Sequence, residues 1–157
     1  MLTLSFNGSD SRVLAWLASS QSEIVQVLRV EMLKQMIRLQ NVVVEDKLSG
    51  EVLGTKTGTL RRAQHASVTS DGSTIAGTVA TDPTASSYGF VHEYGGTFDV
   101  SAYLRKSSQN HDTWVRAHSV TFPERSFLRS SLAEMAPEIV AGLQEALDVY
   151  VREKNLE

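Results

Sequence analysis

Histidine and glutamate side chains offer the first chemistry in this sequence, because they bind metal ions and transfer protons. His92-Glu93 begins like a zinc-protease motif, which requires a second histidine four residues after the first, on a helix. Position 96 is Gly96 instead, and the local alternation predicts a strand. The other histidines show no metal-ligand spacing: His65, His111 and His118. The sequence therefore assigns no metal site.

Motifs for nucleophilic catalysis and phosphate binding are also missing from the sequence. The chain has no cysteine, which excludes thiol catalysis, disulfides and cysteine-ligated zinc. No serine lies in a Gly-x-Ser-x-Gly motif. The segment 54–58 is glycine-flanked but lacks the Gly-Lys-Ser/Thr order of a phosphate loop, so it is interpreted as a linker. We expect no catalytic residue and no cofactor.

Arginine side chains give the sequence its binding chemistry. They remain charged and offer planar, forked donors to carboxylates, carbonyls and phosphates. In Pro123–Arg129, two of them flank an apolar Phe-Leu pair at the start of a helical pattern. The candidate interface residues are Arg61, Arg62, Arg105, Arg116, Arg125, Phe127, Leu128 and Arg129. For Phe127 and Leu128 we weigh two interpretations, a latch between subunits and an anchor within one chain.

The composition sets limits on function. The 157 residues are 41% hydrophobic and 21% charged, which fits one globular domain over 1–157. The formal net charge is −3, so no general basic field exists to hold DNA. Neither a signal peptide nor an apolar run long enough for a membrane span is found, and a cytosolic site of synthesis is expected.

A long N-terminal helix is predicted over about 11–45, with a candidate break at Ser19-Ser20. Its apolar residues recur every three or four positions and form one stripe: Val25, Leu28, Met32, Met36, Leu39 and Val43. Further apolar residues widen this stripe: Val27, Val30, Leu33 and Ile37. Two interpretations stay open, a single central core helix and a helix that buries more than one face, against its own sheet and a second subunit. A short strand or arm is predicted before it, over 1–8.

The middle of the chain is predicted to form an antiparallel sheet. A loop over 46–59 leads to a turn capped by Thr59 and then to strands at 64–70 and 74–81. Asp71-Gly72 between these strands is a hairpin turn signal.

A second set of strands is predicted further along. A loop over 83–87 precedes a strand at 88–94, in which aromatic rings and histidine occupy alternate positions. The segment 97–121 contains a weak internal echo and a polar centre, which predicts a hairpin arm with a polar tip. This tip is either a simple solvent loop or a segment that becomes ordered against a partner.

The C-terminal segment again has helical periodicity, interrupted by Pro137. A helix over about 126–135 and another over about 137–154 are therefore predicted, with Pro137 in the first turn of the second. The summed prediction is an α+β fold: a long N-terminal helix, an antiparallel sheet with a long hairpin, and a C-terminal helix packed on the sheet.

An ordered set of short motifs resembles the tail-completion, or neck, proteins of long-tailed bacteriophages, often described as tail-component or virion-morphogenesis proteins. The motifs are Thr57–Arg62 (Thr-Gly-Thr-Leu-Arg-Arg), Tyr88–Gly95 (Tyr-Gly-Phe-Val-His-Glu-Tyr-Gly), Val115–His118 (Val-Arg-Ala-His) and Pro123–Leu132. The similarity spans roughly residues 25–150.

The resemblance implies a structural virion protein with no enzymatic activity. Such proteins form a ring, commonly sixfold, between the head connector or stopper and the tail terminator or tail tube, and DNA passes through the lumen. The expected location is the virion neck, after synthesis in the host cytoplasm.

Three alternatives stay open. A tail terminator that caps the tail tube has the same helix–sheet–helix organisation. A dimeric ligand-binding α+β domain would contain an apolar pocket. A small metal hydrolase would use His65, His92 and His118 with Glu93.

Overall fold

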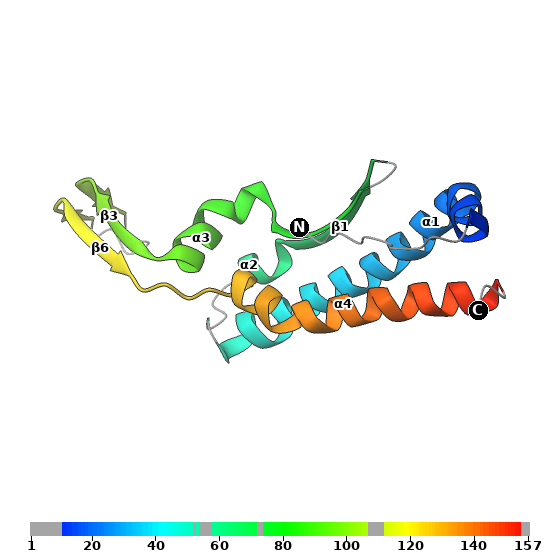
Figure 1. The fold of residues 1–157 in the computed structure, drawn as a ribbon. Coiled ribbons are helices and arrows are strands. Elements are labelled where there is room, and N and C mark those ends of the chain that lie inside the picture. Colours follow the sequence, from blue (N-terminus) through cyan, green and yellow to red (C-terminus); the bar gives the residue numbers. More distant parts are fainter. Residues whose placement is uncertain (1–10, 52, 54–57, 72–73, 107–111, 155–157) are drawn as a thin grey trace. The chain divides into compact units, whose positions relative to one another are not determined.

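A computed structural model describes residues 11–51, 53, 58–71, 74–106 and 112–154 (Figure 1). The predicted N-terminal strand at 1–8, most of the linker at 54–58 and His111 lie outside the described residues. The helices are α1 (Ser11–Asn41), the π-helix η1 (Val42–Glu51), α2 (Thr59–Arg62), α3 (Pro83–Tyr94) and α4 (Leu128–Glu153). The strands are β1 (Gln64–Ser70), β2 (Ile75–Thr81), β3 (Gly96–Val100), β4 (Tyr103–Arg105), β5 (Thr113–Val115) and β6 (His118–Phe122).

The fold is α+β, as the sequence predicts. The long helix comes first, antiparallel strands follow, and a long helix ends the described chain. The strands form three two-stranded sheets with the pairings β1–β2, β3–β6 and β4–β5. No helix in the described ranges is long and apolar enough to cross a membrane.

The chain divides into two compact units. The helix-pair unit comprises Met1–Leu39, Ala66–Val79 and Met135–Glu157. The hairpin unit comprises Gln40–His65 and Ala80–Glu134.

The helix-pair unit contains most of α1 and α4. Tyr150 donates a hydrogen bond of 2.7 Å to Glu23, while Gly142 lies against Gln35, so the two helices run antiparallel. A Cβ atom at Gly77 of β2 would lie 2.7 Å from Met36 Cγ, so any larger residue there would displace the methionine side chains that pack on the strand. The predicted stripe of α1 points inward, with Met36 and Leu39 buried.

The N-terminal helix differs from its prediction at two places. It continues through Ser19-Ser20 without a break, and helical structure extends into η1 as far as Ser49, where a loop was predicted; at Gly50 the backbone leaves the helix with a φ of 137°. The cause of the extension lies in the hairpin unit, where Lys47 and Leu48 are buried. Lys47 forms an ion pair of 3.1 Å with Glu134, and this pairing compensates for the burial of the lysine charge.

Strands β1 and β2 occupy the predicted positions, and Asp71 accepts a hydrogen bond of 3.1 Å from the Thr74 amide at the turn. The predicted cap at Thr59 is wrong. Thr59 is the first residue of α2, and the residue before it, Gly58, has a φ of 69° and makes no side-chain cap. A left-handed backbone at this position favours glycine over threonine.

Helix α3 replaces the predicted loop at 83–87 and the predicted strand at 88–94. Asp82 accepts a hydrogen bond of 2.8 Å from the Thr84 amide, and Pro83 occupies the first turn. The alternating aromatic residues also satisfy helical spacing, because each packs on the residue four positions later. The ring centroids are 4.3 Å apart for Tyr88–His92 and 4.8 Å apart for Phe90–Tyr94.

Helix α4 is continuous, so the predicted division at Pro137 is wrong. Pro137 and Ala133, whose carbonyl loses its helical donor, both lie on the exposed side of the helix. Water can solvate that carbonyl there, which reduces the cost of an internal proline. The buried face keeps helical periodicity: Met135, Ile139, Leu143 and Tyr150.

The hairpin arm is present over 96–122. Strands β3 and β6 pair antiparallel from Gly96↔Phe122 to Val100↔His118, and β4 and β5 continue the arm with Leu104 opposite Trp114 (Figure 1). The polar residues 107–111 of the predicted tip lie outside the described residues.

Candidate assembly interface

The base of the arm is held by Glu93, a buried carboxylate at the end of α3. It accepts hydrogen bonds from the amides of Phe127, Leu128 and Arg129 at 2.8, 2.9 and 2.9 Å. The Ser126 hydroxyl donates to it at 3.0 Å. These amides are the unpaired donors at the start of α4, so Glu93 caps that helix from another part of the chain.

The charge of Glu93 is stabilised in this position. Burial by itself would raise the pKa of Glu93, but the hydrogen bonds from the three amides and the Ser126 hydroxyl outweigh burial and lower it. The carboxylate is therefore ionised at neutral pH, although its side chain is only 5% exposed.

Arg129 completes the cluster around Glu93. Its Nε donates to Glu93 at 3.1 Å, and its Nη2 donates to Glu124 at 2.6 Å. Its guanidinium lies 4.5 Å from the centre of the Tyr94 ring, within cation–π range. The Pro-Glu-Arg-Ser-Phe-Leu-Arg motif thus contains a helix start and the ion pairs that fix it.

Phe127 is fully buried in the hairpin unit, and Leu128 is half-buried. A second subunit could not increase the burial of Phe127, so its placement favours the anchor within one chain. Leu128 retains accessible surface. The role of the pair between subunits stays a prediction.

The remaining candidate arginines lie at separate places in the hairpin unit. Arg61 is half-buried, and its Nε donates to the Val44 carbonyl at 3.1 Å. Arg62 is exposed on α2. Arg105 and Arg116 are exposed on the arm, and Arg125 is exposed beside its base. Only Arg125 and Arg129 belong to the segment around Glu93.

The arm presents apolar side chains to solvent. Trp114 is 64% exposed and Leu104, directly opposite it, is 47% exposed. Tyr103 on β4 is also exposed, and α3 adds three exposed aromatic residues: Tyr88, Phe90 and Tyr94. Leu104 and Trp114 are a directly opposed pair, so they lie on one face of the arm and form its exposed apolar contact surface.

The histidines do not assemble into a metal site in the part of the chain that the structure describes. No group of three or more metal-binding side chains occurs there. His65 lies 3.8 Å from Asp82, and the His118 ring is 2.9 Å from the Arg116 carbonyl. Glu93, which the sequence offered as a metal partner, is occupied by α4.

His92 lies in a helix, where a half-buried strand position was predicted. Its ring packs edge-on against Tyr88 and Phe122, and its Nε2 is buried without a hydrogen-bond partner. Burial lowers the pKa of His92, and the positive charge of Arg125 lowers it further. The folded chain therefore favours the neutral imidazole.

This lowered pKa predicts acid sensitivity of the hairpin unit. The unfolded histidine takes a proton near pH 6.5, whereas the folded one resists it until lower pH. The contribution of His92 to the free energy of unfolding is thus fully present above about pH 6.5 and is lost as pH falls through the folded pKa. Urea unfolding at several pH values should show a steeper acid loss for the natural chain than for His92→Phe. Equal slopes would contradict the prediction.

Compared with models of known protein families, with curated proteins and with solved structures, the chain matches none. The candidate site is therefore identified from the structure alone. It is a hairpin arm with exposed apolar side chains, positioned by a capped helix.

Proposed function

We propose that this chain is a structural subunit of the neck of a long-tailed bacteriophage, where it completes the tail so that it joins the head. The proposal combines the ordered motifs that resemble the tail-completion family with one observation, the exposed apolar pair Leu104 and Trp114 on the arm. Two opposed apolar side chains in solvent are costly for a free monomer and useful for an assembly subunit.

In this role, copies of the chain form a ring, most simply a hexamer. The ring lies between the head connector or stopper and the tail terminator or tail tube, and DNA passes through its lumen. The acidic net charge of −3 suits this passage, because a lumen without excess positive charge does not retain DNA. The arm provides contact surface, and the Glu93 cluster fixes the arm's base to the start of α4.

The decisive experiment is localisation in intact particles by cryo-electron microscopy. Density for this chain as a ring between connector and tail tube would support the neck role and give its copy number. Density that directly caps the last ring of the tube would instead assign a tail terminator. Absence of the chain from every particle would reject both assembly roles.

Trp114→Ala should separate folding from assembly. Because Trp114 is largely exposed, we expect the free energy of unfolding to change by no more than about 0.5 kcal/mol. Infectious particles, measured by complementation of a phage that lacks the gene, should fall at least tenfold, since interface tryptophans often contribute about 2 kcal/mol or more. Ser101→Ala, also exposed on the arm, is the matched control and should leave the titre unchanged.

A further inference from the structure

A second apolar surface lies in the helix-pair unit, on the outer side of α1. Val30, Leu33 and Ile37 are 55%, 42% and 46% exposed. Their spacing of three and four residues places them along one stripe of the helix. The inward stripe of Met36 and Leu39 already packs within the unit, so this outer stripe has no role in the core of the unit.

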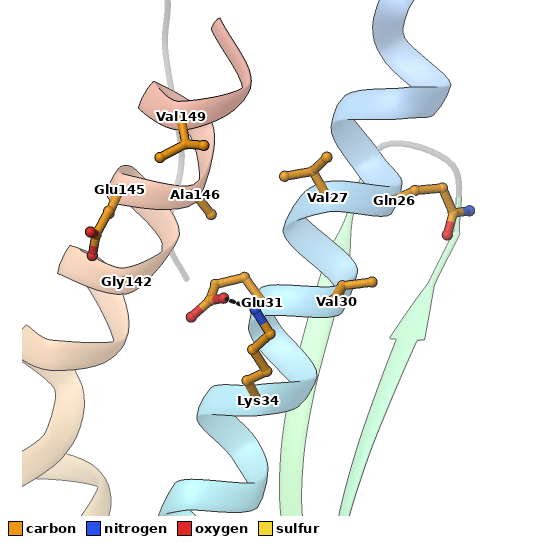
Figure 2. A pocket seen from close by; sticks show the side chains of 9 residues that line it. All are labelled: Gln26, Val27, Val30, Glu31, Lys34, Gly142, Glu145, Ala146 and Val149. Atoms are coloured by element: carbon orange, nitrogen blue, oxygen red, sulfur yellow. Dashed lines mark hydrogen bonds and ion pairs between the residues drawn. The ribbon is translucent and has the colours of Figure 1, made fainter. Parts of the chain in front are cut away.

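The outer stripe borders a groove of about 530 Å³ between α1 and α4 (Figure 2). Its α1 wall combines Val27 and Val30 with polar residues, and its α4 wall combines Ala146 and Val149 with Glu145; the polar residues of the α1 wall are Gln26, Glu31 and Lys34. Gly142 of α4 faces α1, since a Cβ atom there would collide with the Gln35 side chain. Val30 belongs to both features, so the stripe and the groove form one continuous surface.

The two sides of this surface carry opposite charge. Three cations flank the α1 stripe: Arg29, Lys34 and Arg38. Glu31, the one acidic residue in 29–41, is bonded to Gln35 at 2.7 Å and to Lys34 at 3.1 Å. The exposed acidic residues of α4 in the same unit are Glu138, Glu145, Asp148 and Glu153, and the one basic residue of this part of α4 is Arg152, in its last turn. Figure 2 shows Lys34 and Glu145 on opposite walls of the groove.

This charge pattern selects the occupant of the surface. A contact between two α1 stripes would oppose cations with cations, whereas a stripe laid on α4 opposes cations with carboxylates. The stripe cannot lie on α4 of its own unit, because the two helices already pack through Gln35 and Gly142 with the stripe facing out. The complementary α4 must come from another molecule.

We infer that the α1 stripe of one copy docks on the α4 wall of a second copy, with Leu33 and Ile37 against Ala146 and Val149 and with Lys34 meeting Glu145. Burial of apolar side chains drives the contact, and the opposite charges determine which helices meet. This inference rests on the proposed assembly of copies into a ring, and it identifies the surfaces through which they meet.

Charge reversal in the full chain tests this interface. Lys34→Glu and Glu145→Lys should each weaken self-association at least tenfold in sedimentation equilibrium. An equimolar mixture of the two variants should recover it, because each reversed charge then meets its opposite. Glu45→Lys, an exposed reversal in the hairpin unit, is the matched control and should associate like the natural chain.

Site-directed cross-linking provides a readout that does not depend on the stability of the charge variants. The chain has no cysteine, so single-cysteine variants are free of background. A mixture of Leu33→Cys and Val149→Cys chains should form mixed dimers under mild oxidation. A mixture of Leu33→Cys and Ser101→Cys chains should not.

The outcomes separate this interface from the neck role. If each single variant still forms oligomers and no mixed cross-link appears, the proposed interface is wrong. A ring would then have to assemble through another surface. A chain that stays monomeric at all concentrations and forms no mixed cross-links would also overturn the interface. The neck role would still be decided by localisation in particles.

Discussion

Glu93→Ala is expected to reduce the free energy of unfolding by about 3 kcal/mol, because it removes a buried charge from a satisfied network. The carboxylate accepts three amide hydrogen bonds at the start of α4 and one from the Ser126 hydroxyl. Alanine would leave these donors unpaired, and the Phe127 amide is buried. Urea unfolding monitored by circular dichroism measures the loss.

The matched control for Glu93→Ala is Glu138→Ala, an exposed glutamate on α4. It should change the free energy of unfolding by less than about 0.5 kcal/mol. Glu93→Gln should fall between the two, because the amide retains one acceptor oxygen but directs a donor toward other donors. A loss below about 1 kcal/mol for Glu93→Ala would show that Glu93 does not fix the start of α4.

Local patterns in the sequence predict the long elements of this fold well. The three-and-four spacing of α1 identifies its buried stripe, and the turn signal at Asp71-Gly72 places β1 and β2, whereas the internal echo around a polar centre places the arm. Alternation failed for α3, because aromatic residues two positions apart fit a strand and also give helical pairs four positions apart. The helix start at Asp82-Pro83 was the signal that could have decided for a helix.

The Glu93 cluster could not be predicted from local pattern, because its partners are 33 to 36 residues away. The motif Pro123–Arg129 did indicate that its arginines would bind a carboxylate, a carbonyl or a phosphate. The buried partner of Arg129 is the Glu93 carboxylate. Glu93 reaches the start of α4 because residues 83–94 form a helix, and the sequence prediction made 88–94 a strand. The wrong prediction for α3 therefore hid the role of Glu93, which belongs to that same element.

Phe127→Ala is expected to cost about 3–5 kcal/mol of unfolding free energy, the range measured when buried phenylalanine side chains are removed. Phe127 has no exposed surface, and the adjacent Ser131 hydroxyl donates to its carbonyl at 2.6 Å in the same buried region. The cost should be independent of protein concentration, because the side chain is buried within one chain. Chemical unfolding at concentrations that differ by a hundredfold measures this directly.

Leu128→Ala is the matched comparison, because Leu128 is the next residue and is only half-buried. We expect it to cost about 1 kcal/mol in the monomer, since less apolar surface leaves water on folding. If the loss for Phe127→Ala grew with protein concentration, Phe127 would be a latch between subunits and the anchor interpretation would be wrong. If Leu128→Ala left the monomer stable but prevented particle completion, the interface role would belong to Leu128, with Phe127 holding it in position.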